Sequence, residues 1–300
     1  MKLNRNFSGM LFVALTVLFV PLSCSREDEG SISETDLALA QDEAYADAVY
    51  NEVDNMVVSE ITTLDGNNYL TLGLKSTEDD NPCYAVTVDH PDSTHFPKVV
   101  TIDYGDGCTI VFHNDTITRK GQIIITITDR WFMPGAENIV TFNNFYINGV
   151  KIEGTRTITN LGINDEGHLE HGIVLEGGNI TFADGTFMTR DANHVREWIR
   201  HFSPQNDTVM ITGSASGINV LGEQYSRLIT EPLVLVHCQE YKWRWVIVDG
   251  TVEVTNSVTG TTTIDYSAED CDGTVIVSKN GYHHNYAFKY NHRHHHKGGR

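Results

Sequence analysis

Basic residues are scarce in this chain of 300 residues. It has 21 Lys and Arg against 40 Asp and Glu, which gives a formal net charge of −19. Proteins that bind nucleic acid neutralise phosphates with clustered Lys and Arg, so we expect no nucleic acid partner. Disorder is excluded too, because 40% of the residues are hydrophobic and 12 Tyr, 12 Phe and 4 Trp can fill a core. The length suits one large all-β domain or two modest ones.

Catalytic signatures are absent. The sequence has no G-x-S-x-G, H-E-x-x-H, Walker or C-x-x-C motif, and no G-x-G-x-x-G after a strand. We therefore expect no enzyme activity and no cofactor. The alternative is an unrecognised hydrolase, in which two carboxylates such as Glu170 and Glu197 would lie about 5–10 Å apart. The segment from His168 to His171 is interpreted as a surface hairpin, with His168 and Glu170 on one face of a strand and His171 on the other.

The N-terminal apolar run is too short to span a bilayer comfortably. It covers the twelve residues Gly9–Val20 and follows the basic residues Lys2 and Arg5. The sequence Pro-Leu-Ser-Cys that ends at Cys24 resembles a bacterial lipobox. Residues 1–23 are therefore predicted to be a lipoprotein signal peptide, with Cys24 as the lipid attachment site that holds the protein on a membrane. An ordinary secretory signal is the alternative.

An acidic tether is predicted at residues 24–34. Ser-Arg-Glu-Asp-Glu follows Cys24 directly, and the mature 277 residues carry 19 basic against 40 acidic side chains, a net charge of −21. The acidic stretch resembles the export signal that sends Bacteroidetes lipoproteins to the outer leaflet of the outer membrane. We expect a lipid-anchored outer-membrane protein that faces the cell exterior. A solvated linker is the alternative.

One helix is expected, at residues 35–61, with Ser33 or Thr35 as its cap. Leu37, Ala40 and Val53 are among the apolar residues that recur at helical spacing, whereas Asp and Glu occupy much of the other face.

From residue 83 to residue 290 the chain is a succession of short strands with turn signals between them. Asn148-Gly149, Asp249-Gly250 and Asn280-Gly281 are examples of these turns. The short connections predict an antiparallel β body, arranged as a meander or a sandwich, and the lack of strand–helix–strand alternation argues against a parallel α/β fold. Residues 195–202 are read as either a helical turn or a strand.

A weak internal repeat organises this body. Thr-Ile-Asp-Tyr occurs at Thr101–Tyr104 and again at Thr263–Tyr266, within segments 83–128 and 238–290. The chain is thus expected to hold two related β modules, as one continuous sheet or as two halves of a sandwich.

The cysteines follow the repeat. Once Cys24 is lipidated, four cysteines remain, and they allow three connectivities in an oxidising compartment. The repeat selects two structural disulfides, because each pair then closes the same element: Cys83–Cys108 and Cys238–Cys271.

Several motifs together resemble a family of Bacteroidetes outer-membrane lipoproteins. The matching stretches are Tyr104–Cys108, Arg119–Ile125, Val140–Gly149, Ile152–Asn160, Ile211–Gly217 and Thr230–Val234. The second copy of the repeat departs from the family pattern, because Tyr266–Cys271 replaces a Tyr-Gly-Asp-Gly type of turn. The resemblance implies no activity.

Aromatic residues offer a candidate ligand site. Strand alternation places Tyr241, Trp243 and Trp245 on one face, where an exposed row would stack on sugar rings. The same row, if buried, would be the inner face of a sheet.

Two kinds of metal site are conceivable. The His-rich tail, residues 291–300 together with the strand before it, would bind divalent metals through His283, His284, His292, His294, His295 and His296. The aspartates around Gly105 and Cys271 suit calcium, but a plain Asp-Gly turn is favoured there.

Three Asp-Ser/Thr triplets resemble a Bacteroidetes O-glycosylation pattern, with acceptors Ser93, Thr116 and Thr208 in expected loops. The leading hypothesis is a non-catalytic binding or scaffold module at the cell surface, with a glycan or a surface protein as its partner. Metal binding through the His-rich end and an unrecognised hydrolase are the alternatives.

Overall fold

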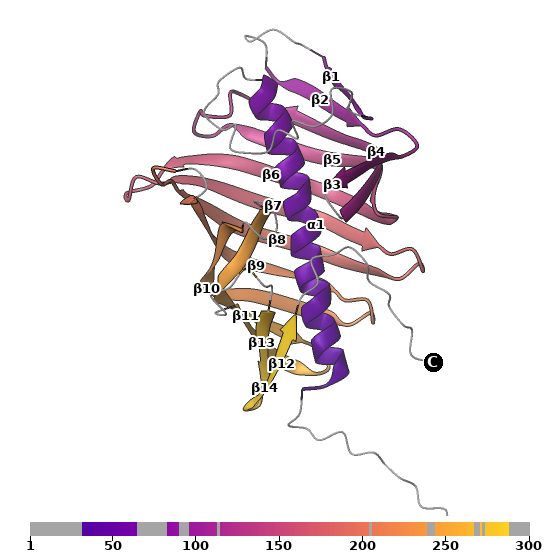
Figure 1. Ribbon diagram of the computed structural model, residues 1–300, viewed down its shortest axis with the longest axis vertical. Coiled ribbons are helices and arrows are strands. Elements are labelled where there is room, and N and C mark those ends of the chain that lie inside the picture. The colour runs from indigo at the N-terminus through magenta and orange to yellow at the C-terminus, as the bar shows by residue number, and fades with distance from the viewer. Residues whose placement is uncertain are drawn as a thin grey trace, which may run out of the picture.

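The structure is a computed structural model that describes residues 32–64, 83–89, 96–112, 115–203, 206–238, 244–266, 271 and 274–287. Its β-strands form one antiparallel sheet, and a single long helix, α1 (Glu34–Leu64), lies across one face of that sheet (Figure 1). The prediction of a mainly-β fold with one N-terminal helix is confirmed. Of the two arrangements expected for the β modules, the described residues form the continuous sheet.

The strands run in sequence order across the sheet, apart from β3, which pairs with β4. Their bounds are β1 (Ala85–Val88), β2 (Lys98–Asp103), β3 (Cys108–Phe112), β4 (Asp115–Ile127), β5 (Glu137–Ile147), β6 (Val150–Ile163), β7 (Leu169–Thr181), β8 (Phe187–Ile199), β9 (Thr208–Ile218), β10 (Gln224–Cys238), β11 (Arg244–Asn256), β12 (Gly260–Asp265), β13 (Thr274–Lys279) and β14 (Tyr282–Ala287). Residues 195–199, read as helix or strand, belong to β8.

Helix α1 begins at a side-chain cap. The Ser33 hydroxyl oxygen accepts the Asp36 N–H at 3.1 Å, and Asp36 in turn accepts the Ser33 N–H at 3.0 Å and its hydroxyl at 2.8 Å. This reciprocal arrangement satisfies donors that the first helical turn leaves free. Ser33 is therefore the cap, and the helix ends three residues beyond the predicted boundary.

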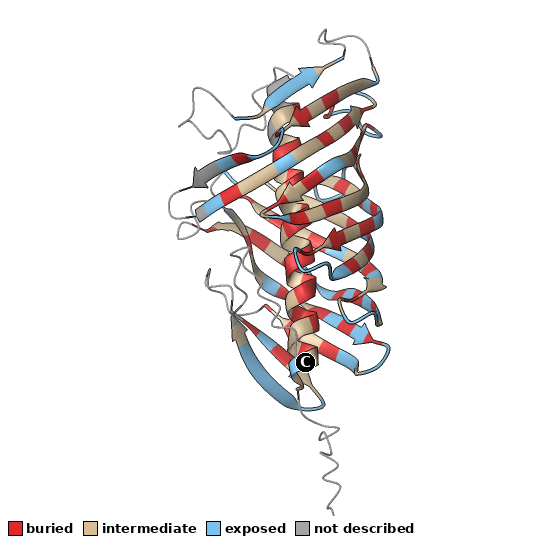
Figure 2. Ribbon diagram, turned by 90° about the vertical axis from the view of Figure 1, so that its right-hand side faces the viewer, coloured by how far each residue is buried: buried red, intermediate tan, exposed pale blue. Residues whose placement is uncertain are grey.

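The core lies between α1 and the sheet. Val49, Val53 and Val57 of α1 pack with Ile102, Ile123 and Phe145 in one apolar cluster, and Leu39 and Ala40 pack with β9–β13 in a second. Along most strands buried residues alternate with partly or fully exposed ones (Figure 2). Buried residues of the strands pack with α1 in both clusters. One helix thus covers both clusters.

The charged face of α1 was predicted wrongly. Asp36, Asp42, Glu43 and Asp54 are at most 3% exposed, although acidic residues were expected on the face away from the core. Arginines on the inner face of the sheet explain the difference, because a buried carboxylate needs a paired cation. Glu43, for example, lies 2.6 Å from Arg190 of β8.

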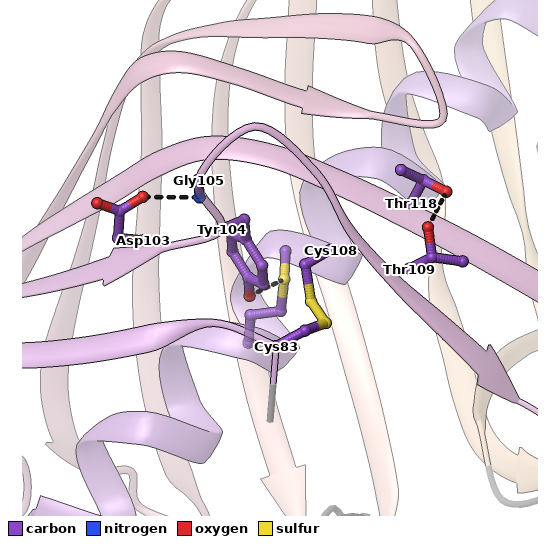
Figure 3. The surroundings of a disulfide bond; sticks show 8 residues. Cys83, Asp103, Tyr104, Gly105, Cys108, Thr109 and Thr118 are labelled. Atoms are coloured by element: carbon purple, nitrogen blue, oxygen red, sulfur yellow. Dashed lines mark hydrogen bonds between the residues drawn. A yellow bond between two sulfur atoms is a disulfide. The ribbon is translucent and has the colours of Figure 1, made fainter. Parts of the chain in front are cut away.

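Both predicted disulfides are present. Cys83–Cys108 has a Cα–Cα distance of 5.4 Å (Figure 3). It joins the chain just before β1 to the first residue of β3. Cys238–Cys271 has a Cα–Cα distance of 5.8 Å and fastens the end of β10. The two disulfides therefore lie in the two repeat segments, towards opposite ends of one sheet.

The Asp-Gly interpretation of the first repeat turn fits the structure. The Asp103 carboxylate accepts the Gly105 N–H at 2.8 Å and the Gln122 side-chain N–H at 2.8 Å. Asp270 and Asp272, in the second copy, lie outside the described residues.

A candidate ligand-binding groove

Several of the predicted site residues fall outside the described part of the chain. This applies to Cys24, Ser93, Tyr241, Trp243 and the tail histidines beyond residue 287. Of the aromatic row, Trp245 is described. It is half-buried, and its ring lies edge-on to that of Trp198, with the ring centroids 5.4 Å apart. The centroid of the His237 ring is 3.9 Å away. Trp245 therefore packs against the second apolar cluster, and the stacking hypothesis now depends on Tyr241 and Trp243.

The other candidate metal ligands and glycosylation sites among the described residues lie on strands. His283 and His284 are exposed neighbours on β14, where successive side chains point to opposite faces, and His283 Nδ1 lies 2.7 Å from Ser278 Oγ. Thr116 and Thr208 lie in β4 and β9, so the expectation that they occupy loops was wrong. Each Asp-Thr pair lies where a strand begins.

A groove opens on the outer face of the sheet, opposite α1. We call it the outer groove. It has a volume of about 700 Å³ and crosses five strands, β7 to β11. Its exposed lining residues are Val174, Glu176, Asp191, Asn193, Ser214, Ser216, Ser226, Leu228, Glu253 and Thr255.

Small residues on β9 make the floor of the outer groove. The stretch Gly213–Gly217 offers only Ser214 and Ser216 on the outer face, with buried Ala215 between them. Gly213 has φ of +122°, and a Cβ there would overlap the carbonyl oxygen of Asn193. Glycine thus lets β9 approach β8 closely, and the longer side chains of the neighbouring strands form the walls.

Register aligns the lining residues in rows. Val174, Asn193, Ser214, Leu228 and Glu253 are successive cross-strand partners over the five strands. A second row, two residues away, runs from Asp191 through Ser216 and Ser226 to Thr255. Neighbouring side chains in such rows are close enough to contact one ligand together.

The chemistry of the outer groove is polar and acidic. It combines the carboxylates of Glu176, Asp191 and Glu253 with the Asn193 amide and several hydroxyls. Asp191 accepts the Gly177 N–H at 2.7 Å, whereas the side chains of Asn193 and Glu253 form no hydrogen bond with another described residue. These groups remain available to a ligand.

Apolar and basic residues complete the lining. Val174 and Leu228 are 38% and 51% exposed and add an apolar surface. The one basic residue among the lining residues is Arg227, which is 2% exposed and points its guanidinium at Asp47 of α1. An anionic ligand would therefore meet carboxylates without an exposed cation, so the groove suits neutral or cationic ligands.

A second cluster could hold a metal ion. The ligand atoms of Glu166, His168 and Glu197 all lie within 4.8 Å of one another. His168 Nδ1 is 2.6 Å from Glu197 Oε1, and this hydrogen bond is the main reason that the Glu197 pKa is lowered. The Asn164 amide donates to both Glu170 and Glu197, which are direct cross-strand partners.

His171 takes no part in this cluster. As predicted, it points away from His168, but the expectation that the whole segment lies on the surface was wrong for this residue. Its ring is buried and stacks on Trp131, with the ring centroids 4.6 Å apart. Burial, with a contribution from Arg196, lowers its pKa to about 3, so it is neutral.

No family model matches the chain, and comparison with characterised proteins and with solved structures found no match either. Among the described residues, no helix combines the length and the hydropathy needed to cross a membrane.

Proposed function

We propose that this protein is a non-catalytic binding module of the bacterial cell surface, anchored through lipid on Cys24, and that its outer groove binds a neutral glycan. The row of side chains from Val174 to Glu253 carries the proposal. It places two apolar side chains and two uncommitted hydrogen-bonding groups, Asn193 and Glu253, across five strands of one groove.

The dimensions and chemistry of the groove support a sugar ligand. Its volume of about 700 Å³ lies within the usual range of ligand sites. Carboxylates and the amide oxygen of Asn193 accept hydrogen bonds from hydroxyl groups, while serine and threonine both donate and accept. Exposed Val174 and Leu228 can cover the apolar C–H face of a sugar ring.

A lipid anchor in the outer membrane, facing the cell exterior, would suit a glycan-binding protein. A tether at residues 24–33 would precede α1, and ten extended residues reach at most roughly 35 Å. The folded part would therefore stay close to the membrane while its outer groove contacts the medium.

The test is a screen of neutral and acidic polysaccharides, followed by calorimetry with the chain produced without its first 24 residues. Asn193→Ala should weaken binding about fivefold, because it removes a hydrogen bond worth about 1 kcal/mol. Glu253→Gln should weaken binding by a similar factor, because it turns a charge-assisted hydrogen bond into a weaker neutral one. Glu166→Gln removes an exposed carboxylate outside the groove and should leave affinity unchanged. Equal affinity in all three variants would place the ligand elsewhere, and no bound glycan would leave a surface-protein partner as the remaining hypothesis.

Capture of a divalent cation is a second candidate function, favoured by the convergence of Glu166, His168 and Glu197. Imidazole with carboxylates suits Zn²⁺ or Mn²⁺. The test is Zn²⁺ titration of the chain, of His168→Ala, and of a variant with His292, His294, His295 and His296 changed to Asn. Loss of tight binding in the tail variant alone would assign the metal to the tail.

A further inference from the structure

A cavity of about 20 Å³ lies between α1 and the inner face of the sheet. Its polar lining comes from both sides. The helix contributes Asp47, Tyr50 and Asn51, and the strands contribute Arg156, Arg190, His194, Arg196 and Arg227. The remaining walls are apolar and include Ile173, Ile211 and Ile229.

The guanidinium groups around the cavity outnumber the carboxylates that pair with them. Asp54 binds Arg156 at 2.5 Å and Arg196 at 3.0 Å. Asp47 binds Arg190 at 2.6 Å and Arg227 at 2.8 Å, and Glu43 binds Arg190 at 2.6 Å.

Four arginines therefore share three carboxylates, which leaves one positive charge unbalanced. His194 adds none, because burial and the nearby Arg227 and Arg190 lower its pKa well below the usual value. Interior charges of one sign are unfavourable unless a counter-charge lies near them.

Three nitrogen atoms in this lining are buried and have no hydrogen-bond partner among the described residues. They are Nε of Arg196, Nη1 of Arg227 and Nε2 of His194. Arg227 is 2% exposed and His194 is 8% exposed, so bulk water does not reach them freely. Buried N–H groups of charged side chains are rarely left unpaired in folded proteins.

We propose that this cavity binds one monatomic anion of the size of chloride. Unpaired N–H groups on two guanidinium groups would donate to it, and its charge would balance the fourth arginine. A cavity of about 20 Å³ admits a single small particle and excludes phosphate or sulfate with their oxygens. A water molecule could accept the same hydrogen bonds, but it would leave the positive charge unbalanced.

Small side chains on the inner face explain why the space exists. Ala192 lines the cavity, and its cross-strand partner Ala215 is followed on β10 by Arg227. The guanidinium of Arg227 extends over these alanines toward Asp47 of α1. The anion would thus lie where the helix and three neighbouring strands meet, and it would bind the folded chain alone.

The direct test is a crystal of the chain grown in bromide, with anomalous diffraction recorded at the bromine edge. A bromine peak inside the cavity, beside Arg196 and Arg227, is expected. Bromine at surface sites alone, or density for water that does not change with the halide, would overturn the proposal.

Stability gives an independent test. Raising chloride from about 1 mM to about 100 mM, with gluconate holding the ionic strength constant, should raise the melting temperature, since a ligand of the native state stabilises it by mass action. Arg227→Gln should abolish this chloride dependence. The matched control is Arg119→Gln, which removes another helix-binding arginine outside the cavity and should keep it.

Each outcome of these experiments either confirms or overturns the anion site. If Arg227→Gln does not fold, the bromide map of the unaltered chain still confirms or overturns the site. If both variants keep the chloride dependence, the effect arises elsewhere and the proposal fails.

Discussion

Asp54 of α1 and Arg156 of β6 form a two-pronged ion pair across 102 residues of sequence, with N–O distances of 2.5 and 2.7 Å. Both side chains are at least 96% buried. The pair fixes α1 over β6, and it shows that the helix is held by charge as well as by apolar contact.

Removing one partner of this pair should be costly. Asp54→Asn leaves Arg156 buried without its counter-charge, and we expect a loss of about 3–5 kcal/mol in the free energy of unfolding. Urea denaturation measures it. Lys151→Met, which breaks the more exposed pair with Glu153, should change stability by less than about 1 kcal/mol. Similar losses in the two variants would contradict this account.

Asp42 predicts a pH dependence of the free energy of unfolding. Burial, with repulsion from Glu43, raises the pKa of Asp42 to about 7. The folded chain therefore holds this proton more tightly than the unfolded chain. Its contribution to stability is complete below about pH 4 and is lost as the pH rises to about 7. Asp42→Asn should stabilise the protein by roughly 2–4 kcal/mol at pH 8 and change it little at pH 4. A pH-independent effect would show that Asp42 stays ionised in the fold.

Each disulfide should contribute measurably. The pairs Cys83–Cys108 and Cys238–Cys271 are separated by 25 and 33 residues. Replacing either pair with serine should cost about 2–5 kcal/mol, mainly because the unfolded chain regains freedom. Denaturant midpoints of the two double variants, compared with the oxidised chain, provide the measurement. A variant as stable as the parent would show that its bridge is dispensable.

Gly213 should not tolerate a side chain. Its φ of +122° and the overlap of a Cβ with the Asn193 carbonyl mean that Gly213→Ala must displace β8 or β9. We expect a loss of at least about 2 kcal/mol. Gly172→Ala is the control, because φ there is ordinary and the new Cβ would meet only the Leu161 side chain. Thermal melts of both variants distinguish steric clash from a general effect of alanine.

Most of the fold could be predicted from short sequence motifs. The Asn-Gly and Asp-Gly turns mark neighbouring strands, and the Thr-Ile-Asp-Tyr repeat led to the correct cysteine pairs. The arginine partners of the helix escaped prediction because Glu43 and Arg190 are separated by 147 residues, and an acidic helix face normally indicates solvent. A signal did exist, since Arg156, Arg190 and Arg227 alternate with partly or fully exposed residues on strands whose other buried residues are mainly apolar.

The outer groove was also out of reach of sequence reasoning. Its rows depend on register, and β7 shifts register between Leu175 and Gly178 where it pairs with β8. A one-residue error there would turn Glu176 and Asp191 to different faces. The small-residue stretch of β9 was visible as a family-like motif, but the hollow that it makes appears only beside Asn193 and Leu228.

The N-terminal part of α1 contacts the last two strands, β13 and β14. Asp36 lies 2.8 Å from Lys279 of β13, and Gln41 accepts a hydrogen bond from Tyr286 of β14. These contacts join residues 243 and 245 positions apart. Lys279 and Tyr286 are made 243 and 245 residues after Asp36 and Gln41, so the start of α1 has these partners only once β13 and β14 have been made. A chain that is exported N-terminus first would therefore pass through its translocation channel before its earliest segment can lock into place.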